Sequence, residues 1–208
     1  HTVIRHTPKN KEVAPPPALT TVTLQQSASN IYGLKGEKTM ALAQLLYHLG
    51  YLTYHRTDSN LQSEETYLEI INYLGKKYDE DDILPTKRNF KQANKNAQEG
   101  HESITITSIS EEFHPDNIKQ HWIEQGQWEL DTMSEKEKKY CFNSNHLRVY
   151  EIIWYRTLAV QMRNAIYDAS ETVVDIAGNK ITMISNRLKT TKLYDGGEKV
   201  MSGWLSLK

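Results

Sequence analysis

The chain has 208 residues, a net charge of −1 at pH 7, 25% charged and 38% hydrophobic residues. The near-neutral charge argues against a protein that coats nucleic acid through bulk charge alone, and no stretch approaches the ~18 apolar residues of a membrane span. The single cysteine, Cys141, excludes an intrachain disulfide and suits a reducing cytosol, and the scattered histidines do not predict a zinc site. Because the chain starts at His1 rather than Met, we expect a fragment of a longer protein.

The first part of the chain predicts a short β segment, a joint and a helix. Residues 2–4 are of β type, and the prolines at 15–17 form a stiff extended joint that we interpret as a domain boundary. Apolar residues at helical spacing predict a helix over 21–32. Thr20 or Thr21 can cap its start and Gly33 can end it.

A second helix is predicted over 37–49, with a leucine stripe and Gly50 as its left-handed stop. A short strand over 51–54 follows at once. Helix, turn, helix, glycine and strand together resemble a winged-helix unit. This unit would place Tyr54 at the end of a rigid strand, before an irregular polar stretch.

The rest of the chain predicts two further helices and then β structure. A helix starts at Ser63, a mostly irregular stretch covers 79–98, and the strongest late helix spans 144–163. Segments 172–176 and 181–184 flank a glycine turn and predict a hairpin, and 199–207 predicts a final strand. We therefore predict an α+β multi-domain fold, in which a helical domain is inserted into a β domain.

The run from Gly50 to Ser59 carries the chemistry. Tyr54 is followed two residues later by Arg56, and then by Thr57, Asp58 and Ser59. A phenol is mostly neutral at pH 7 and needs a base or a nearby cation to become a nucleophile. The Arg56 fork matches phosphate oxygens. The cluster predicts attack on a phosphate, although a tyrosine at a strand end is more commonly a packing residue.

Four motifs in order resemble the type IA DNA topoisomerase family, of the bacterial topoisomerase I type. Together with the tail from Gly197 to Leu205, which resembles the family's closing Gly-Trp strand, they make the match cover most of the chain, from about Pro15 to Leu205. They are PPPALTTVTLQQSAS from Pro15, KTMA through QLLY and the tyrosine run from Lys38 to Ser59, AQEGHESI from Ala97, and LRVYEIIWYRTLAVQM from Leu147.

The resemblance implies a domain plan and an activity. A helical gate domain with the winged-helix-like unit would span 14–162, and a β-rich arch domain would comprise 1–13 and 163–208. The activity would be transient cleavage of one DNA strand through a 5′-phosphotyrosine, strand passage and religation. This would relax negatively supercoiled DNA in the cytoplasm without ATP.

The resemblance also implies roles for single residues. Tyr54, Arg56 and His101 would be catalytic, and Asp58 would orient Arg56. DNA contacts would come from Arg56, Thr57, Asp58, Ser59, Gln26 and Ser29. The family's Mg²⁺ is bound by an N-terminal TOPRIM domain, which nothing in this sequence matches, so we expect no metal here and an inactive isolated fragment. The implied partners are single-stranded or supercoiled DNA and the missing domains of the same chain.

Two departures from the family pattern stand near the site. Thr105 and Ile106 occupy positions that the family usually fills with Arg and Pro, which predicts the loss of a basic phosphate contact. His55 stands where the family often has Met, so the neighbour of the tyrosine is more polar than usual.

Two rival interpretations stay open. A non-enzymatic winged-helix-like DNA-binding module would need a polar recognition helix, and the predicted helix over 37–49 is largely apolar. A tyrosine recombinase-type strand transferase would need several separated arginines and a late tyrosine, whereas this tyrosine lies early in the chain.

Overall fold

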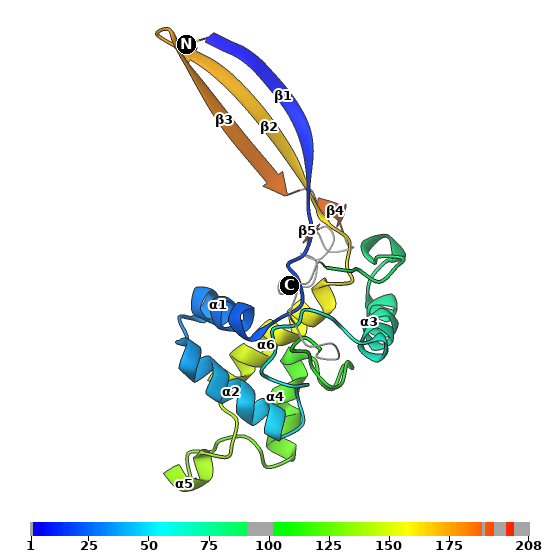
Figure 1. Cartoon of the computed structure of the whole chain (residues 1–208), viewed down its shortest axis with the longest axis vertical. Coiled ribbons are helices and arrows are strands. Elements are labelled where there is room, and N and C mark those ends of the chain that lie inside the picture. Colours follow the sequence, from blue (N-terminus) through cyan, green and yellow to red (C-terminus); the bar gives the residue numbers. More distant parts are fainter. Residues whose placement is uncertain (1, 91–101, 189, 194–198, 202–208) are drawn as a thin grey trace.

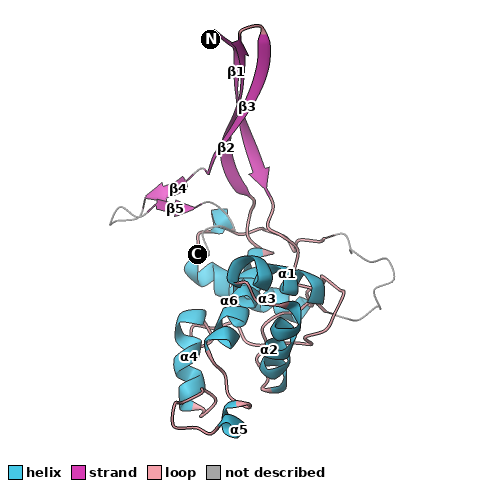
Figure 2. Ribbon diagram, turned by 90° about the vertical axis from the view of Figure 1, so that its left-hand side faces the viewer, coloured by secondary structure: helices cyan, strands magenta, loops and turns pink. Residues whose placement is uncertain are grey.

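The computed structural model describes residues 2–90, 102–188, 190–193 and 199–201. A body of helices occupies one end of the molecule, and a long twisted sheet projects from the other (Figures 1 and 2). The predicted α+β class is therefore confirmed. Among the described helices, none is long and apolar enough to cross a bilayer.

The first two helices follow the local signals of the sequence. Helix α1 (Thr21–Tyr32) begins after Thr20, whose side chain accepts a hydrogen bond from the backbone of the first turn, and it ends at Gly33 with φ of 66°. Helix α2 (Gly36–His48) follows after a tight turn. Gly50 has φ of 86°, which an L side chain rarely adopts. The predicted left-handed stop is thus confirmed.

The remaining helices pack around α6, which lies at the centre of the body and contacts α1, α2, α3 and α4. Their bounds are α3 Glu64–Lys77, the short 3-10 helix η1 Glu80–Asp82, α4 Pro115–Glu124, α5 Glu135–Lys138 and α6 Ser144–Ala159. The largest buried side chains include Trp122 of α4 and Trp154 of α6. Large apolar surfaces of this kind supply most of the favourable free energy of burial.

The projecting sheet joins the two ends of the chain. Strand β1 (Thr2–Val13) pairs antiparallel with β2 (Ala165–Ile176), which pairs antiparallel with β3 (Asn179–Leu188). All the helices therefore lie between β1 and β2 in the sequence. Ala177 and Gly178 both have positive φ, as a two-residue hairpin turn requires. Two short strands, β4 (Thr190–Leu193) and β5 (Lys199–Met201), form a separate pair.

Several element bounds differ from the predictions. Strand β1 is longer than residues 2–4, because pairing with β2 supports residues whose own β propensity is low. Helix α6 ends at Ala159 rather than at residue 163. Helix α4 was not predicted. The strand expected over 51–54 is reduced to one β-bridge, and the final strand is described only to Met201.

Arg88 holds the junction between the helices and the sheet. Its Nε donates to the carbonyl of Val160 at 3.0 Å, and its Nη2 donates to the carbonyl of Met162 at 2.9 Å and to Oδ1 of Asn164 at 3.1 Å. Val160 is the C-cap of α6, where an α-helix leaves carbonyls without partners, and Met162 and Asn164 follow it on the way to β2. Arg88 therefore fixes the direction in which the chain leaves the body for β2.

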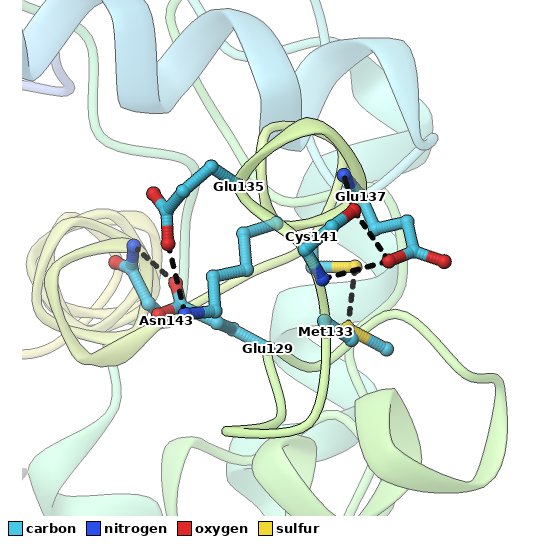
Figure 3. A network of polar contacts seen from close by, with 8 residues as sticks. Glu129, Met133, Glu135, Glu137, Cys141 and Asn143 are labelled. Carbon is cyan, nitrogen blue, oxygen red and sulfur yellow. Dashed lines mark hydrogen bonds and ion pairs between the residues drawn. The ribbon is translucent and has the colours of Figure 1, made fainter.

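The loop between α4 and α6 is held by its own polar contacts (Figure 3). Asn143 Nδ2 donates to Glu129 Oε2 at 3.2 Å, and the Cys141 thiol donates to Met133 Sδ at 3.8 Å. Burial, with the negative charges of Glu129 and Glu137 adding to it, raises the pKa of the Cys141 thiol. A thiol that stays protonated is a poor nucleophile, so this end of the body holds no activated sulfur.

His146, in the first turn of α6, makes the stability of the body depend on pH. Its Nδ1 accepts a hydrogen bond from the backbone N–H of Asn143 at 3.1 Å, and burial lowers the pKa of His146 to about 4. The ordinary pKa is 6.5, so the unfolded chain takes up the proton first. We expect His146 to cost roughly 3 kcal/mol of unfolding free energy as the pH falls from 6.5 to 4.

Denaturant unfolding at several pH values tests this expectation. A His146→Gln variant should show a flatter fall in unfolding free energy over the same pH range. His55 and His114, whose pKa values burial also lowers, titrate in both proteins and cancel in the comparison. Equal slopes for the parent and the variant would contradict the assignment.

Candidate active site

The segment over 103–107 forms the floor beneath the tyrosine run. Leu52 and Ile106 form an antiparallel β-bridge. The backbone N–H of Thr53 donates to the carbonyl of Thr105 at 2.9 Å. The Thr53 hydroxyl adds to this pairing, because it accepts from the N–H of Thr105 at 3.0 Å and donates to the carbonyl of Ser103 at 3.1 Å. The residue before Tyr54 is thus fixed by backbone and side chain together.

The same segment also touches two other parts of the chain. The N–H of Ile104 donates to the carbonyl of Leu19 at 2.8 Å, and the N–H of Ser103 donates to the carbonyl of Leu61 at 2.7 Å. Ser103 and Ile104 belong to the third sequence motif, and Leu19 belongs to the first. Three motifs that lie far apart in the sequence therefore meet around the tyrosine run.

The fourth motif supports this arrangement from α6. Arg156 donates from Nη1 to the carbonyl of Pro17 at 3.2 Å and from Nη2 to the hydroxyl of Ser27 at 3.4 Å. At the next residue of α6, the carbonyl of Thr157 accepts a hydrogen bond from Gln62 at 3.1 Å. Both ends of the site, before α1 and after the tyrosine run, are thus anchored to one buried helix.

Tyr54 stands at the surface of this framework. It keeps 48% of its surface exposed, whereas Leu52 and His55 on either side of it are buried. Its ring lies edge-on to the ring of Tyr47, with centroids 5.7 Å apart, and it also contacts the ring of His55 at 5.5 Å. A phenol on a fixed backbone, with an accessible ring, meets the geometric requirement for a nucleophile.

Arg56 follows Tyr54 by two positions in the chain and carries a fixed positive charge. Its side chain is exposed, and its predicted orientation by Asp58 stays a prediction. Burial, followed by the positive charge of Arg56 and the nearby His48, lowers the pKa of His55. The residue between Tyr54 and Arg56 thus stays neutral at pH 7.

Thr57 and Ser59 are buried and shape the loop after Tyr54. The Thr57 N–H donates to the hydroxyl of Thr21 at 2.9 Å, and the Thr21 N–H donates to the carbonyl of Thr57 at 2.9 Å. The Thr57 hydroxyl accepts from the N–H of Ser59 at 3.0 Å, and the Ser59 hydroxyl accepts from the N–H of Leu61 at 3.2 Å. These two hydroxyls stabilise the loop, and their predicted contact with DNA stays a prediction.

The other predicted residues are only partly gathered at the site. Gln26 and Ser29 lie exposed on α1, roughly 7 and 12 Å along the helix from Thr21. His101 lies outside the described residues. Sequence reasoning missed Tyr47 and assigned no role to Thr53. A contact such as Thr53 to Thr105 joins residues from separate motifs, and no local pattern signals it.

The departures from the family pattern have a structural consequence. Thr105 and Ile106 are both buried in the floor of the site, so they contribute backbone pairing and packing there.

No group of three or more His, Cys, Asp or Glu side chains within the described residues could hold a metal ion.

Comparison with known proteins identifies relatives over most of the chain. A family model described as DNA topoisomerase matches residues 1–197. DNA topoisomerase 1 of Helicobacter pylori (strain ATCC 700392 / 26695) is 34% identical over 201 residues, which cover 93% of this chain and 24% of that protein. DNA topoisomerase 1 of Haemophilus influenzae is 35% identical over 187 residues, which cover 87% and 18%. The chain thus spans about a quarter or less of these relatives.

A solved structure shares the fold. Full-length topoisomerase I from Thermotoga maritima matches with a TM-score of 0.65 at 24% identity, covering 96% of this chain and 32% of that chain. The match includes nearly the whole chain, so it extends to the helical body and the projecting sheet together.

The Thr57 hydroxyl provides a test of the loop. Thr57→Val leaves the buried N–H of Ser59 without an acceptor, which should lower the unfolding free energy by about 1–3 kcal/mol. Thr57→Ser keeps the hydroxyl and should change it by less than about 1 kcal/mol. Urea unfolding of both variants measures the difference. Equal stability of the two would show that this hydrogen bond does not hold the loop.

Proposed function

We propose, because this chain belongs to the DNA topoisomerase family, that Tyr54 is the nucleophile of a type IA DNA topoisomerase. The Tyr54 oxygen attacks a backbone phosphorus of single-stranded DNA, and the bond from that phosphorus to the 3′ oxygen breaks. The 5′ phosphate becomes an ester of Tyr54, and the departing 3′ oxygen takes up a proton. The 3′ hydroxyl later attacks the same phosphorus, which rejoins the strand and frees Tyr54. No ATP is needed, because the tyrosine ester conserves the free energy of the broken phosphodiester bond.

One observation carries this proposal: the described parts of all four family motifs meet around a half-exposed tyrosine. Leu19, Thr53 and Ser103 come from three of the motifs and share one backbone network, and Arg156 ties the fourth to the first. Many polar groups around Tyr54 form hydrogen bonds within the chain, yet the Tyr54 ring stays accessible. Such a framework suits a nucleophile whose position must be kept through repeated cleavage and rejoining.

Arg56 is proposed to stabilise the negative charge that gathers on the phosphate during attack. Its side chain is exposed two residues after Tyr54 in the chain, and a guanidinium can donate two parallel hydrogen bonds to phosphate oxygens. His101 is proposed as a second donor to the phosphate. Exposed Asp58, Gln26 and Ser29 are proposed to contact the bound strand, while Thr57 and Ser59 would hold the loop that presents Arg56.

A moving helical body is proposed to open the gap in the cleaved strand. The gate would comprise 14–162 with its winged-helix-like unit, and the arch would comprise 1–13 and 163–208. In the described part of the chain, the polypeptide passes from β1 to the helices before α1 and returns to the sheet after α6. Arg88 donates hydrogen bonds to the second of these two connections. Few crossings favour rigid-body motion of one part against the other.

The proposed substrate is single-stranded or negatively supercoiled DNA in the cytoplasm, and other domains of the same protein would complete the site. Mg²⁺ is proposed to act from a TOPRIM domain of the same protein, as the resemblance to the type IA family implies. In this scheme Tyr54 and Arg56 bind and orient the phosphate, and neither residue coordinates the metal ion. The isolated chain is accordingly proposed to be inactive in relaxation.

The rival interpretations differ in what they require of Tyr54. A non-enzymatic DNA-binding module would make no covalent adduct. A tyrosine recombinase-type enzyme would hold the 3′ phosphate rather than the 5′ phosphate. The family membership and the exposed Tyr54 beside Arg56 favour the topoisomerase scheme.

Tyr54→Phe should abolish the covalent protein–DNA adduct while leaving the fold intact, because only the attacking oxygen is removed. The measurement is denaturing gel analysis of labelled single-stranded DNA after reaction with the whole enzyme that contains this chain. Tyr140→Phe removes a hydroxyl from another exposed tyrosine, to which no role is assigned, and serves as the matched control. An adduct in the Tyr54→Phe protein would refute the assignment.

Arg56→Lys should lower the rate of strand cleavage by about 100-fold, because the positive charge remains but the two-pronged donor is lost. Single-turnover cleavage of an oligonucleotide by the whole enzyme gives this rate. Arg187→Lys, an exposed substitution on β3, should leave the rate unchanged. Cleavage by Arg56→Lys at the parent rate would mean that the arginine acts through charge alone or not at all.

A further inference from the structure

Tyr47 lies in the last turn of α2, a position that is both rigid and close to Tyr54. Helix α2 packs against α1 and α6, so its last turn is held by the body. The helix closes with the N–H of Leu49 donating to the carbonyl of Leu45 at 3.0 Å and the N–H of Tyr51 donating to the carbonyl of Leu46 at 2.9 Å. The path from Tyr47 to the tyrosine run is therefore short and well bonded.

Three rings form a cluster at this point. The Tyr47 and Tyr54 rings meet edge to face, with centroids 5.7 Å apart and planes at 79°. Tyr47 also contacts the ring of His55 at 5.1 Å, and Tyr54 contacts the same His55 ring at 5.5 Å. His55 is only 6% exposed, and its ring contacts both tyrosine rings. Edge-to-face pairs of this kind are directional as well as attractive.

Tyr54 needs such support because regular structure does not extend to it. The β-bridge ends at Leu52, the last backbone bond of this pairing is made by Thr53, and Tyr54 itself lies in irregular structure. Backbone pairing thus sets where the Cα of Tyr54 lies, but it does not set the direction of the side chain. Attack in line with the leaving oxygen requires that direction to be defined.

We infer that Tyr47 is a positioning residue for Tyr54: its ring, presented by the end of α2, fixes the plane and direction of the Tyr54 ring for attack on the phosphate. This inference rests on the proposed role of Tyr54 as the nucleophile. Tyr47 acts through the aromatic ring, since no hydrogen bond between described residues uses its hydroxyl. It does not need to touch DNA.

Two substitutions separate the ring from the hydroxyl. Tyr47→Phe keeps the edge-to-face contact and should retain the cleavage rate within about twofold. Tyr47→Leu keeps apolar bulk but removes the aromatic edge, and should slow single-turnover cleavage about 3- to 10-fold. The whole enzyme is used, with the cleavage rate at saturating DNA and the Kd for the same oligonucleotide measured on Tyr54→Phe backgrounds. The Kd should not change.

Each outcome decides the inference. Slow cleavage by Tyr47→Leu with an unchanged Kd and rescue by Tyr47→Phe would support positioning. A parent cleavage rate in Tyr47→Leu would overturn it, and so would a weakened Kd with an unchanged rate at saturation, which would make Tyr47 a DNA contact. If both variants lost activity and also thermal stability, Tyr47 would be assigned a role in folding, which would overturn the inference. If Tyr54 is not the nucleophile, the Tyr54→Phe enzyme will still form a covalent adduct with DNA, whatever the Tyr47 variants do.

Discussion

The pairing of Thr53 with Thr105 is the constraint on which the rest of the site depends. It joins the tyrosine run to the segment over 103–107, and that segment in turn bonds to Leu19 and Leu61. An exposed side chain at the end of a loop would normally sample many directions. Here the backbone just before Tyr54 is bonded to a segment that is itself bonded to Leu19 and Leu61, so an accessible residue is combined with a fixed position. The cost of ordering the loop is offset by buried hydrogen bonds rather than by burial of the tyrosine itself.

Local signals were sufficient to predict those elements whose ends are chemically marked. Helices α1 and α2 were predicted nearly to the residue, because Thr20, Gly33 and Gly50 mark their ends. Strand β1 was underestimated, because its length is set by pairing with β2 at the other end of the chain. The family assignment made from the four motifs is confirmed by the match over 1–197.

The sequence suggested which residues carry the chemistry of the candidate site, but not what supports them. Tyr54 and Arg56 stand in one short run and were chosen as candidates from their residue types and from the family resemblance. The sequence did not show that Thr57 and Ser59 turn inward, because the same hydroxyls suit a loop hydrogen bond and a phosphate contact equally well. Nor could it show that Tyr47 meets Tyr54, since the two rings approach only after the chain turns at Gly50.

The central claim is that DNA becomes covalently attached to one oxygen of this chain. The most direct test is to denature the whole enzyme during reaction with single-stranded DNA, digest the protein, and identify the nucleotide-bearing peptide by mass spectrometry. We expect a single modified peptide with a 5′-linked phosphate on Tyr54. Attachment at another residue, or linkage through a 3′ phosphate, would contradict it.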